Sequence, residues 1–186
     1  MVNASAARMP DLKVVFTGPM GAGKTTAIRG ISQGQTLSTE VPISQGAQGD
    51  KRFTTVGLDY GECALGEGLV LKLFGTPGQE RFRFMWDILA RGAFGVVVLA
   101  DNSQGEPLAQ TLHYLQAFAP HLPARRMVVG VGRLHSPAAP GLDEYCAHLA
   151  RHGFAQVPVI DADARRAEDV RVLLSVLVSM VEMEHA

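Results

Sequence analysis

Near its N-terminus the chain reads Gly18-Pro19-Met20-Gly21-Ala22-Gly23-Lys24-Thr25, followed by Thr26. An apolar run at residues 12–16 precedes this stretch, and a segment that favours a helix follows it. The spacing G-x-x-x-x-G-K-[ST] between a strand and a helix is typical of a loop whose inward N–H groups bind phosphate oxygens. The N-terminus of the following helix also favours negative charge. The stretch therefore predicts a nucleoside-phosphate site rather than an ordinary strand–helix connection.

The residues of this loop have separate predicted roles. Lys24 is expected to reach the β- and γ-phosphates, and the hydroxyl of Thr25 to ligate Mg²⁺. Thr26 lies in the first helical turn, where we expect it to meet the α-phosphate. The other predicted phosphate contacts come from the loop itself, namely Gly18, Met20, Gly21, Ala22 and Gly23.

Composition limits the classes of protein that this chain can represent. With 186 residues, 47% of them hydrophobic, we expect one domain over residues 1–186 with a buried core and a flexible lead-in at residues 1–11. Seventeen Lys and Arg against 18 Asp and Glu argue against nucleic-acid binding and a polybasic membrane surface. Without a bilayer-spanning run or lipidation signal, we expect a cytoplasmic protein with no direct membrane anchor. Cys63 and Cys146 are expected to be reduced and packed in the core.

The order of the predicted elements indicates an α/β fold. Apolar runs predict buried strands at residues 12–16, 94–100, 127–131 and 157–160, and helices are expected at 107–118, 142–152 and 167–184. Residues 54–60 and 69–74 predict a hairpin beside the first strand, and residues 32–53 are expected to form a long loop. Alternating strands and helices imply a doubly wound, mostly parallel sheet.

Three segments resemble small GTPases of the Ras superfamily, Rab proteins especially. They are Thr55-Val56-Gly57-Leu58-Asp59-Tyr60, Pro77-Gly78-Gln79-Glu80-Arg81-Phe82-Arg83 and Arg91-Gly92-Ala93-Phe94-Gly95-Val96-Val97-Val98. The run Phe74-Gly75-Thr76-Pro77-Gly78-Gln79 is closer still to bacterial small Ras-like GTPases, a group that includes gliding-motility and polarity regulators. This resemblance implies a P-loop NTPase of the Ras-like three-layer α/β/α type, with a six-stranded, mostly parallel sheet and about five helices.

The resemblance also implies roles for individual residues. Thr55 matches the switch-I threonine that coordinates Mg²⁺, the N–H of Gly78 would meet the γ-phosphate, and Gln79 would orient the attacking water. Asp163-Ala164-Arg165 resembles a loop that faces the base, in which the N–H of Ala164 meets a base oxygen and Arg165 stacks on the purine.

Three departures from the family pattern qualify these roles. Gly75 stands where the family carries a metal-linked aspartate; Asp59 is a possible replacement, although a solvated edge residue is the favoured reading. Met20 replaces a glycine and is expected to crowd the γ-phosphate and any residue that a partner inserts there, which favours either slow intrinsic hydrolysis or an unusual activator. The guanine-reading N-K-x-D motif is absent, because the segment where it is expected ends in Arg133-Leu134-His135. The sequence therefore does not distinguish guanine from adenine as the preferred base.

The leading functional prediction is a regulatory switch that binds GTP and GDP with Mg²⁺ and hydrolyses GTP slowly, with ATP as an alternative nucleotide. The alternative from another class is an interaction module that binds nucleotide without hydrolysing it. A small-molecule kinase is disfavoured, because Gln79 and Thr55 fit attack by water and no lid of arginines is evident.

Two further hypotheses concern partners and transition-state charge. The resemblance implies a regulatory partner on the switch face, either a Roadblock-type dimer or a GTPase-activating protein, that grips Phe82, Phe84 and Trp86; core packing of these rings is the alternative. Arg52 lies three residues before Thr55, as does the arginine that heterotrimeric G-protein α subunits supply in cis. A solvated loop charge is the competing interpretation of Arg52. Four histidines are read as surface residues without metal or triad partners: His113, His121, His148 and His152.

Overall fold

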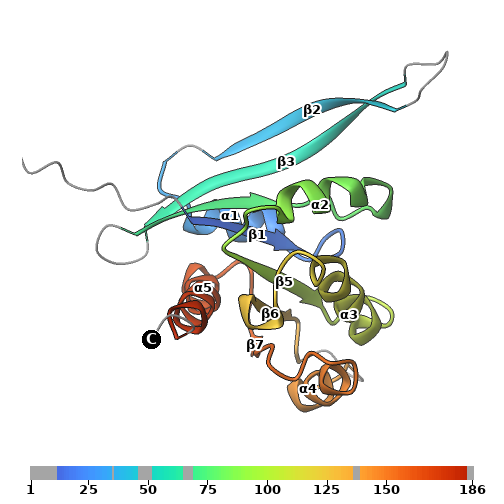
Figure 1. Cartoon of the computed structure of the whole chain (residues 1–186), viewed down its shortest axis with the longest axis vertical. Helices are drawn as coiled ribbons and strands as arrows, with labels where there is room; N and C mark the ends of the chain where they lie inside the picture. Colours follow the sequence, from blue (N-terminus) through green and yellow to red (C-terminus); the bar gives the residue numbers. More distant parts are fainter. Residues whose placement is uncertain (1–11, 35, 46–51, 65–68, 136–138, 184–186) are drawn as a thin grey trace, which may run out of the picture.

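The computed structural model describes residues 12–34, 36–45, 52–64, 69–135 and 139–183, with residues 38–45 and 52–56 described by their backbone alone. The described strands form one seven-stranded sheet in the order β2-β3-β4-β1-β5-β6-β7 (Figure 1). Five strands run parallel: β1 (Leu12–Thr17), β4 (Val70–Gly75), β5 (Gly95–Asp101), β6 (Met127–Gly132) and β7 (Val159–Asp161). β2 (Leu37–Gln45) and β3 (Arg52–Ala64) pair in antiparallel fashion, and β3 is also antiparallel to β4.

Five described α-helices cover the two faces of this sheet. They are α1 (Lys24–Ile31), α2 (Arg83–Ala90), α3 (Pro107–Phe118), α4 (Leu142–Arg151) and α5 (Ala167–Glu182), with 3₁₀ turns at Glu80–Phe82 and Ala124–Arg126. Figure 1 shows α3 and α4 on one side of the central strands and α5 on the other. None of these helices is long and apolar enough to cross a membrane.

Alternating side chains of the central strands divide the core into two layers. Val96 and Val98 of β5 pack with residues of α2, α3 and α4, whereas Val97 and Leu99 pack with residues of α1 and α5. All seven residues of β5 are buried, as expected for a strand that is covered on both faces. The predicted three-layer α/β architecture with a mostly parallel sheet is therefore confirmed.

One segment differs from its prediction. The expected loop at residues 32–53 contains the strand β2, which pairs with β3 from Leu37↔Tyr60 to Gln45↔Arg52 and adds a seventh strand to the six that were expected. Leu37, Val41 and Ile43 alternate with polar residues and Pro42 in the sequence, a weak strand pattern among many loop-forming residues. Figure 1 shows the resulting hairpin projecting from the rest of the molecule.

The predicted phosphate loop lies between a central strand and its helix. β1 pairs with β4 on one side and β5 on the other, and residues 18–23 connect its carboxyl end to Lys24, the first residue of α1. Gly23 has φ 97°, and a Cβ on it would lie 2.5 Å from the Cβ of Ala164, so only glycine fits this approach of two loops. Open α/β sheets place ligands at this edge.

Two of the three rings predicted to grip a partner lie in the core instead. Phe82 is 4% exposed and Trp86 is 1% exposed, whereas Phe84 is 40% exposed. The indole N–H of Trp86 donates to the carbonyl of Pro77 at 2.9 Å, and its ring lies 4.8 Å from that of Tyr114 in α3. Trp86 is buried because it lies on the apolar face of α2, together with Leu89 and Ala90, and this face of the helix packs on the core.

The two cysteines have different surroundings. Cys63 on β3 is buried, as predicted, and burial raises the pKa of its thiol. Cys146 is exposed, so its predicted place in the core is wrong. It lies one residue after the buried Tyr145 on α4, and the neighbouring position on a helix points in a different direction.

Candidate nucleotide site

A cavity of about 620 Å³ lies beside the phosphate loop. One wall is formed by the loop and the start of α1, with Gly21, Ala22, Gly23 and Thr26. The opposite wall comes from the segments that follow β6 and β7, with Arg133, His135, Asp163, Ala164 and Arg165. The structure thus brings four of the residues predicted for the phosphates and all five predicted for the base around one cavity.

Lys24 lies beneath the phosphate loop, with its ammonium bonded to the loop backbone. The Nζ atom donates to the carbonyl oxygens of Gly18 and Pro19, each at 2.7 Å, and the residue is 8% exposed. Burial lowers the pKa of Lys24 to about 8, against the opposing effect of the Asp59 charge. These two hydrogen bonds hold the ammonium within the loop in which it is expected to contact the phosphates.

Thr25 and Asp59 meet at the edge of the same loop. The Thr25 hydroxyl donates to the Asp59 carboxylate. Asp59 on β3 is paired in register with Gly75 on β4. A Cβ built on Gly75 would lie 3.1 Å from the Cβ of Asp59 and 3.3 Å from its Oδ2. The favoured reading of Asp59 as a solvated edge residue is therefore wrong, and its carboxylate fills the space beside position 75.

These two side chains also fit a magnesium ion. A hydroxyl and a carboxylate are hard oxygen ligands, and Mg²⁺ in nucleotide sites commonly uses one or two such groups together with phosphate oxygens. Thr25 and Asp59 would hold the ion here, and its chemical contribution when bound is to neutralise charge on the phosphates. Within the described residues, no cluster of three or more His, Cys, Asp or Glu forms a separate metal site.

The turn after β4 packs directly on the phosphate loop. A Cβ on Gly78 would lie 2.6 Å from the backbone N of Met20, so the two backbones are in close contact. Gln79 is exposed, and its Nε2 lies 3.9 Å from the Sδ of Met20. Met20 is 67% exposed, so its side chain lies at the surface beside the predicted water-orienting residue.

Thr55 and Arg52 lie on β3, outside the part of the strand that contacts the phosphate loop. Thr55 pairs with Pro42 of β2, and Arg52 pairs with Gln45. Thr55 is four residues from Asp59, or roughly 13 Å along an extended strand. The side chains of both residues lie outside the described part of the structure. Mg²⁺ coordination by Thr55 and charge stabilisation by Arg52 therefore stay predictions. Both roles require this end of β3 to approach the phosphates.

The base side of the cavity carries charged groups that are already paired. Arg165 lines the cavity and donates to both carboxylate oxygens of Asp163 at 2.6–3.1 Å, and its stacking on the purine stays a prediction. These hydrogen bonds lower the pKa of Asp163 to about 2. His135 is exposed at the rim, so the position of the absent guanine-reading carboxylate is accessible to a base.

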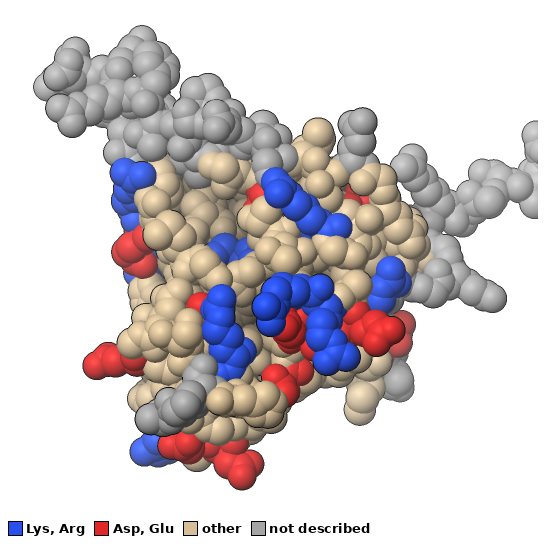
Figure 2. Space-filling view, turned by 180° about the vertical axis from the view of Figure 1, so that it is seen from behind, with Lys and Arg blue, Asp and Glu red and all other residues tan. Residues whose placement is uncertain are grey.

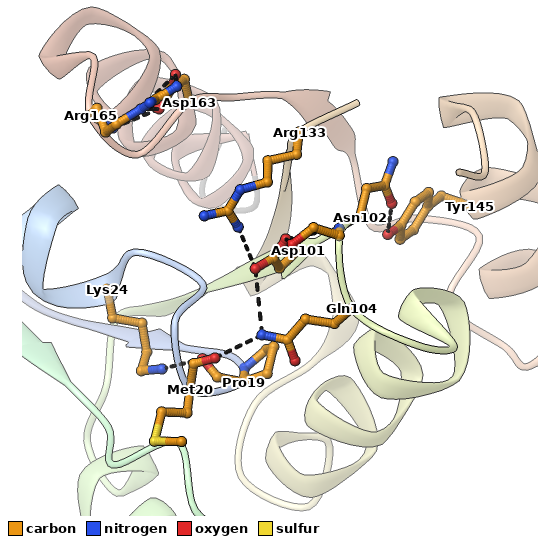
Figure 3. A network of polar contacts seen from close by, with 11 residues as sticks. Pro19, Met20, Lys24, Asp101, Asn102, Gln104, Arg133, Tyr145, Asp163 and Arg165 are labelled. Atoms are coloured by element: carbon orange, nitrogen blue, oxygen red, sulfur yellow. Dashed lines mark hydrogen bonds and ion pairs between the residues drawn. The ribbon is translucent and has the colours of Figure 1, made fainter. Parts of the chain in front are cut away.

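A network that sequence reasoning missed links the base side to the phosphate loop (Figure 3). Arg133 is bonded to the carboxylate of Asp101 at the end of β5, and Gln104 bridges Asp101 to the carbonyl of Met20. Burial raises the pKa of Asp101, but hydrogen bonds from Arg133 and Ser103 outweigh that effect and lower it. A carboxylate directly after a wholly apolar strand, at the sheet edge where ligands bind, is the sequence signal that could have identified it.

His113 on α3 and His121, three residues after the end of that helix, pair with carboxylates of the segment that follows the β4 turn. His113 Nε2 lies 2.8 Å from Glu80 Oε2, and His121 Nε2 lies 3.1 Å from Asp87 Oδ1. All four residues are at least partly exposed, so these contacts join two surface segments.

On the face shown in Figure 2, Lys and Arg side chains gather near the middle with Asp and Glu between them.

Comparisons with known proteins bear on both family and fold. The family model described as "Conserved hypothetical ATP binding protein" matches residues 16–119. The uncharacterized protein MJ1339 of Methanocaldococcus jannaschii is 30% identical over 95 residues, which cover 51% of this chain and 54% of that protein. The Ras-related protein SEC4 of Candida albicans is 24% identical over 142 residues, or 72% of this chain and 65% of SEC4. The matches thus span less than two thirds of either relative.

A solved structure shows the fold. The Arl6 BBS3 small GTPase from Trypanosoma brucei, with the bound nucleotide analogue GppNp, superposes with a TM-score of 0.67 at 19% identity. The superposition covers 94% of this chain and 99% of that protein. The chain therefore has the Ras-like small-GTPase fold that its sequence predicts.

Proposed function

We propose that this chain, which belongs to the family described as conserved hypothetical ATP-binding proteins, is a Mg²⁺-dependent nucleotide switch that hydrolyses GTP to GDP and phosphate. The observation that carries this proposal is the meeting of Thr25 and Asp59 at the start of α1, next to the buried Lys24, while the neighbouring Gly23 and Thr26 line the cavity. The ammonium suits the negative charge of a bound triphosphate, and the hydroxyl and the carboxylate suit its Mg²⁺.

The proposed chemistry is attack of water on the γ-phosphorus. A bond forms from the water oxygen to phosphorus, the bond to the β–γ bridging oxygen breaks, and the water proton leaves with the products. Gln79 would orient the water, and Lys24 would stabilise the charge on the phosphates. The γ-phosphate would also draw Thr55 out of its pairing with β2, which gives the protein two states.

A second candidate function has its own support. The Sδ of Met20 lies 3.9 Å from the Nε2 of Gln79, and a side chain there competes with an attacking water for the same amide. Together with the family description as ATP-binding, this contact favours a module that binds ATP or GTP without turnover. Binding then sets the affinity for a partner, and no phosphate is released.

One experiment separates the two candidates. Purified protein is incubated with Mg²⁺ and GTP or ATP, and both released phosphate and retained nucleotide are measured by chromatography. The switch predicts slow phosphate release that Gln79→Leu reduces, whereas Lys24→Ala abolishes nucleotide retention. Retained triphosphate without phosphate release favours the non-hydrolysing module. Absence of retention in the wild-type protein would contradict both.

We also propose a regulatory protein partner on the switch face, such as a Roadblock-type dimer or a GTPase-activating protein. The support is the exposed apolar pair Phe84 and Ile88 on α2, which are 40% and 59% exposed. These residues lie one helical turn apart on the helix that follows the β4 turn, and that turn contacts the phosphate loop. Pull-downs with Phe84→Ser should lose partners that depend on the triphosphate, whereas Met183→Ser, at the distant end of α5, serves as the control.

A further inference from the structure

The peptide bond between Met20 and Gly21 separates two cavities. Gly21 lines the cavity of about 620 Å³ at the nucleotide site. Met20 and Gln104 line a neighbouring cavity of about 560 Å³ between the phosphate loop and α3. The Nε2 of Gln104 donates to the Met20 carbonyl at 2.8 Å, on the side of this second cavity (Figure 3). Because a trans peptide points its N–H opposite to its C=O, the N–H of Gly21 is directed away from Gln104.

The direction of this peptide is not fixed by the loop alone. Gly21 has φ 84°, and glycine tolerates both hands of backbone conformation, so rotation of the Met20–Gly21 peptide plane meets little steric resistance. A partner outside the loop is therefore needed to hold the carbonyl on one side. Gln104 is the donor that the structure places there.

Gln104 is itself held by a buried anchor. Its Nε2 lies 3.4 Å from Oδ2 of Asp101, and its backbone N–H donates to the Asp101 carbonyl at 3.1 Å. Asp101 is 4% exposed and also accepts hydrogen bonds from the backbone N–H and the hydroxyl of Ser103, at 2.9 and 2.7 Å. Arg133, with φ 58°, turns its guanidinium back onto the same carboxylate. A carboxylate with this many donors has a fixed orientation, and so does the amide that it holds.

We propose that Gln104 is a positioning residue of the nucleotide site, which aims the N–H of Gly21 at the phosphates by holding the Met20 carbonyl outside the cavity. This inference rests on the proposed nucleotide binding and adds to it a residue from the segment between β5 and α3. Donors that are fixed before the ligand arrives stabilise phosphate charge without a cost of reorientation. Loss of Gln104 should therefore weaken one phosphate contact while leaving the loop in place.

The sequence allows this single peptide to be observed directly. Met20–Gly21 is the only Met–Gly pair in the chain. Protein made with ¹³C-carbonyl methionine and ¹⁵N-glycine therefore gives one carbonyl–amide correlation in its NMR spectrum. The carbonyl shift reports the hydrogen bond from Gln104, and the amide proton shift reports the phosphate contact when Mg²⁺ with GDP or ADP is added.

The expected result has two parts. In Gln104→Ala the Met20 carbonyl signal should move upfield, because its hydrogen bond is lost. The displacement of the Gly21 amide on addition of nucleotide should fall by at least half. Gln104→Lys, which keeps a donor that can reach both the Met20 carbonyl and Asp101, should restore most of that displacement. Gln110→Ala is the matched control, since Gln110 also donates its amide to a backbone carbonyl, that of Gly105 at 2.7 Å.

The NMR experiment tests the positioning role of Gln104 and the proposed nucleotide binding separately. A nucleotide-induced displacement that is as large in Gln104→Ala as in the wild type overturns the positioning role alone. A wild-type signal that neither nucleotide moves overturns the proposed function, and with it the purpose assigned to Gln104.

Discussion

Asp59 faces Gly75 across the β3–β4 pair, and its carboxylate occupies the space into which a side chain at position 75 would extend. The Ras-like pattern expects an aspartate at the position of Gly75. In this chain the carboxylate comes from the neighbouring strand, sixteen positions earlier in the sequence, and reaches the Thr25 hydroxyl from there. In the proposed metal site, the carboxylate therefore comes from β3 instead of β4.

The first prediction concerns this exchange of strands. Asp59→Gly should weaken Mg²⁺ binding to the nucleotide complex by about 10–100-fold, because groups that orient the metal typically have effects of that size. The double variant Asp59→Gly with Gly75→Asp should recover most of the affinity, since the freed space accepts the new side chain. Titration of Mg²⁺ against nucleotide dissociation provides the measurement.

Gly75→Asp alone supplies the control for the exchange. Its new Cβ would lie 3.1 Å from the Cβ of Asp59, and two carboxylates in one space repel each other. We therefore expect this single variant to be less stable than the double variant. An affinity for Mg²⁺ that Asp59→Gly does not change would remove Asp59 from the site.

The second prediction concerns the pH dependence of nucleotide binding. Burial lowers the pKa of Lys24 to about 8, and bound phosphates favour its charged form. The pKa is therefore higher in the complex than in the free protein, so binding takes up a proton above pH 8 and affinity falls as the pH rises. The slope should approach tenfold per pH unit until the pKa of the complex is reached. Equilibrium dialysis of ADP between pH 7 and 10 tests this, with Lys24→Arg expected to lack the slope.

The third prediction concerns recognition of the base. His135 is exposed at the rim of the cavity, where an aspartate would accept hydrogen bonds from the N1–H and 2-amino groups of guanine. His135→Asp should raise the ratio of GTP to ATP affinity by about 10–100-fold, the range of a bidentate pair with a base edge. His152→Asp, at the end of α4, introduces the same charge away from the cavity and should leave the ratio unchanged. An unaltered ratio in His135→Asp would show that this segment does not approach the base.

The fourth prediction concerns the arginine three residues before Thr55. If Arg52 stabilises transition-state charge in cis, Arg52→Ala should slow single-turnover hydrolysis by at least about tenfold, or roughly 1.4 kcal/mol of barrier, at unchanged nucleotide affinity. Lys51→Ala, the neighbouring basic residue, should have little effect, and Gln79→Leu gives the reference for loss of catalysis. Equal rates in Arg52→Ala and wild type would assign the charge stabilisation to a partner or to no arginine.

The sequence predicts well those parts of the fold that depend on local pattern. The phosphate loop follows from glycine spacing, and β5 follows from a continuous apolar run. The helix α3 begins at Pro107 and ends at Phe118 in both prediction and structure, because proline marks a first turn.

The parts that the sequence predicts poorly depend on contacts between distant residues. The place of Asp59 is set by the β3–β4 register and by an empty position at Gly75, neither of which has a local signal. The role of Asp101 depends on an arginine 32 positions away. The strand β2 was missed because its alternation is weak and its stability comes from pairing with β3.

The placement of Trp86 gives the protein an internal optical probe. Its indole is the only one in the chain, and it joins the Pro77 carbonyl of the β4 turn to the aromatic ring of Tyr114 on α3. Any rearrangement of the turn that contacts the phosphate loop changes the polarity and hydrogen bonding around this ring. The intrinsic fluorescence of the unmodified protein therefore reports the state of that turn in real time, without an attached dye.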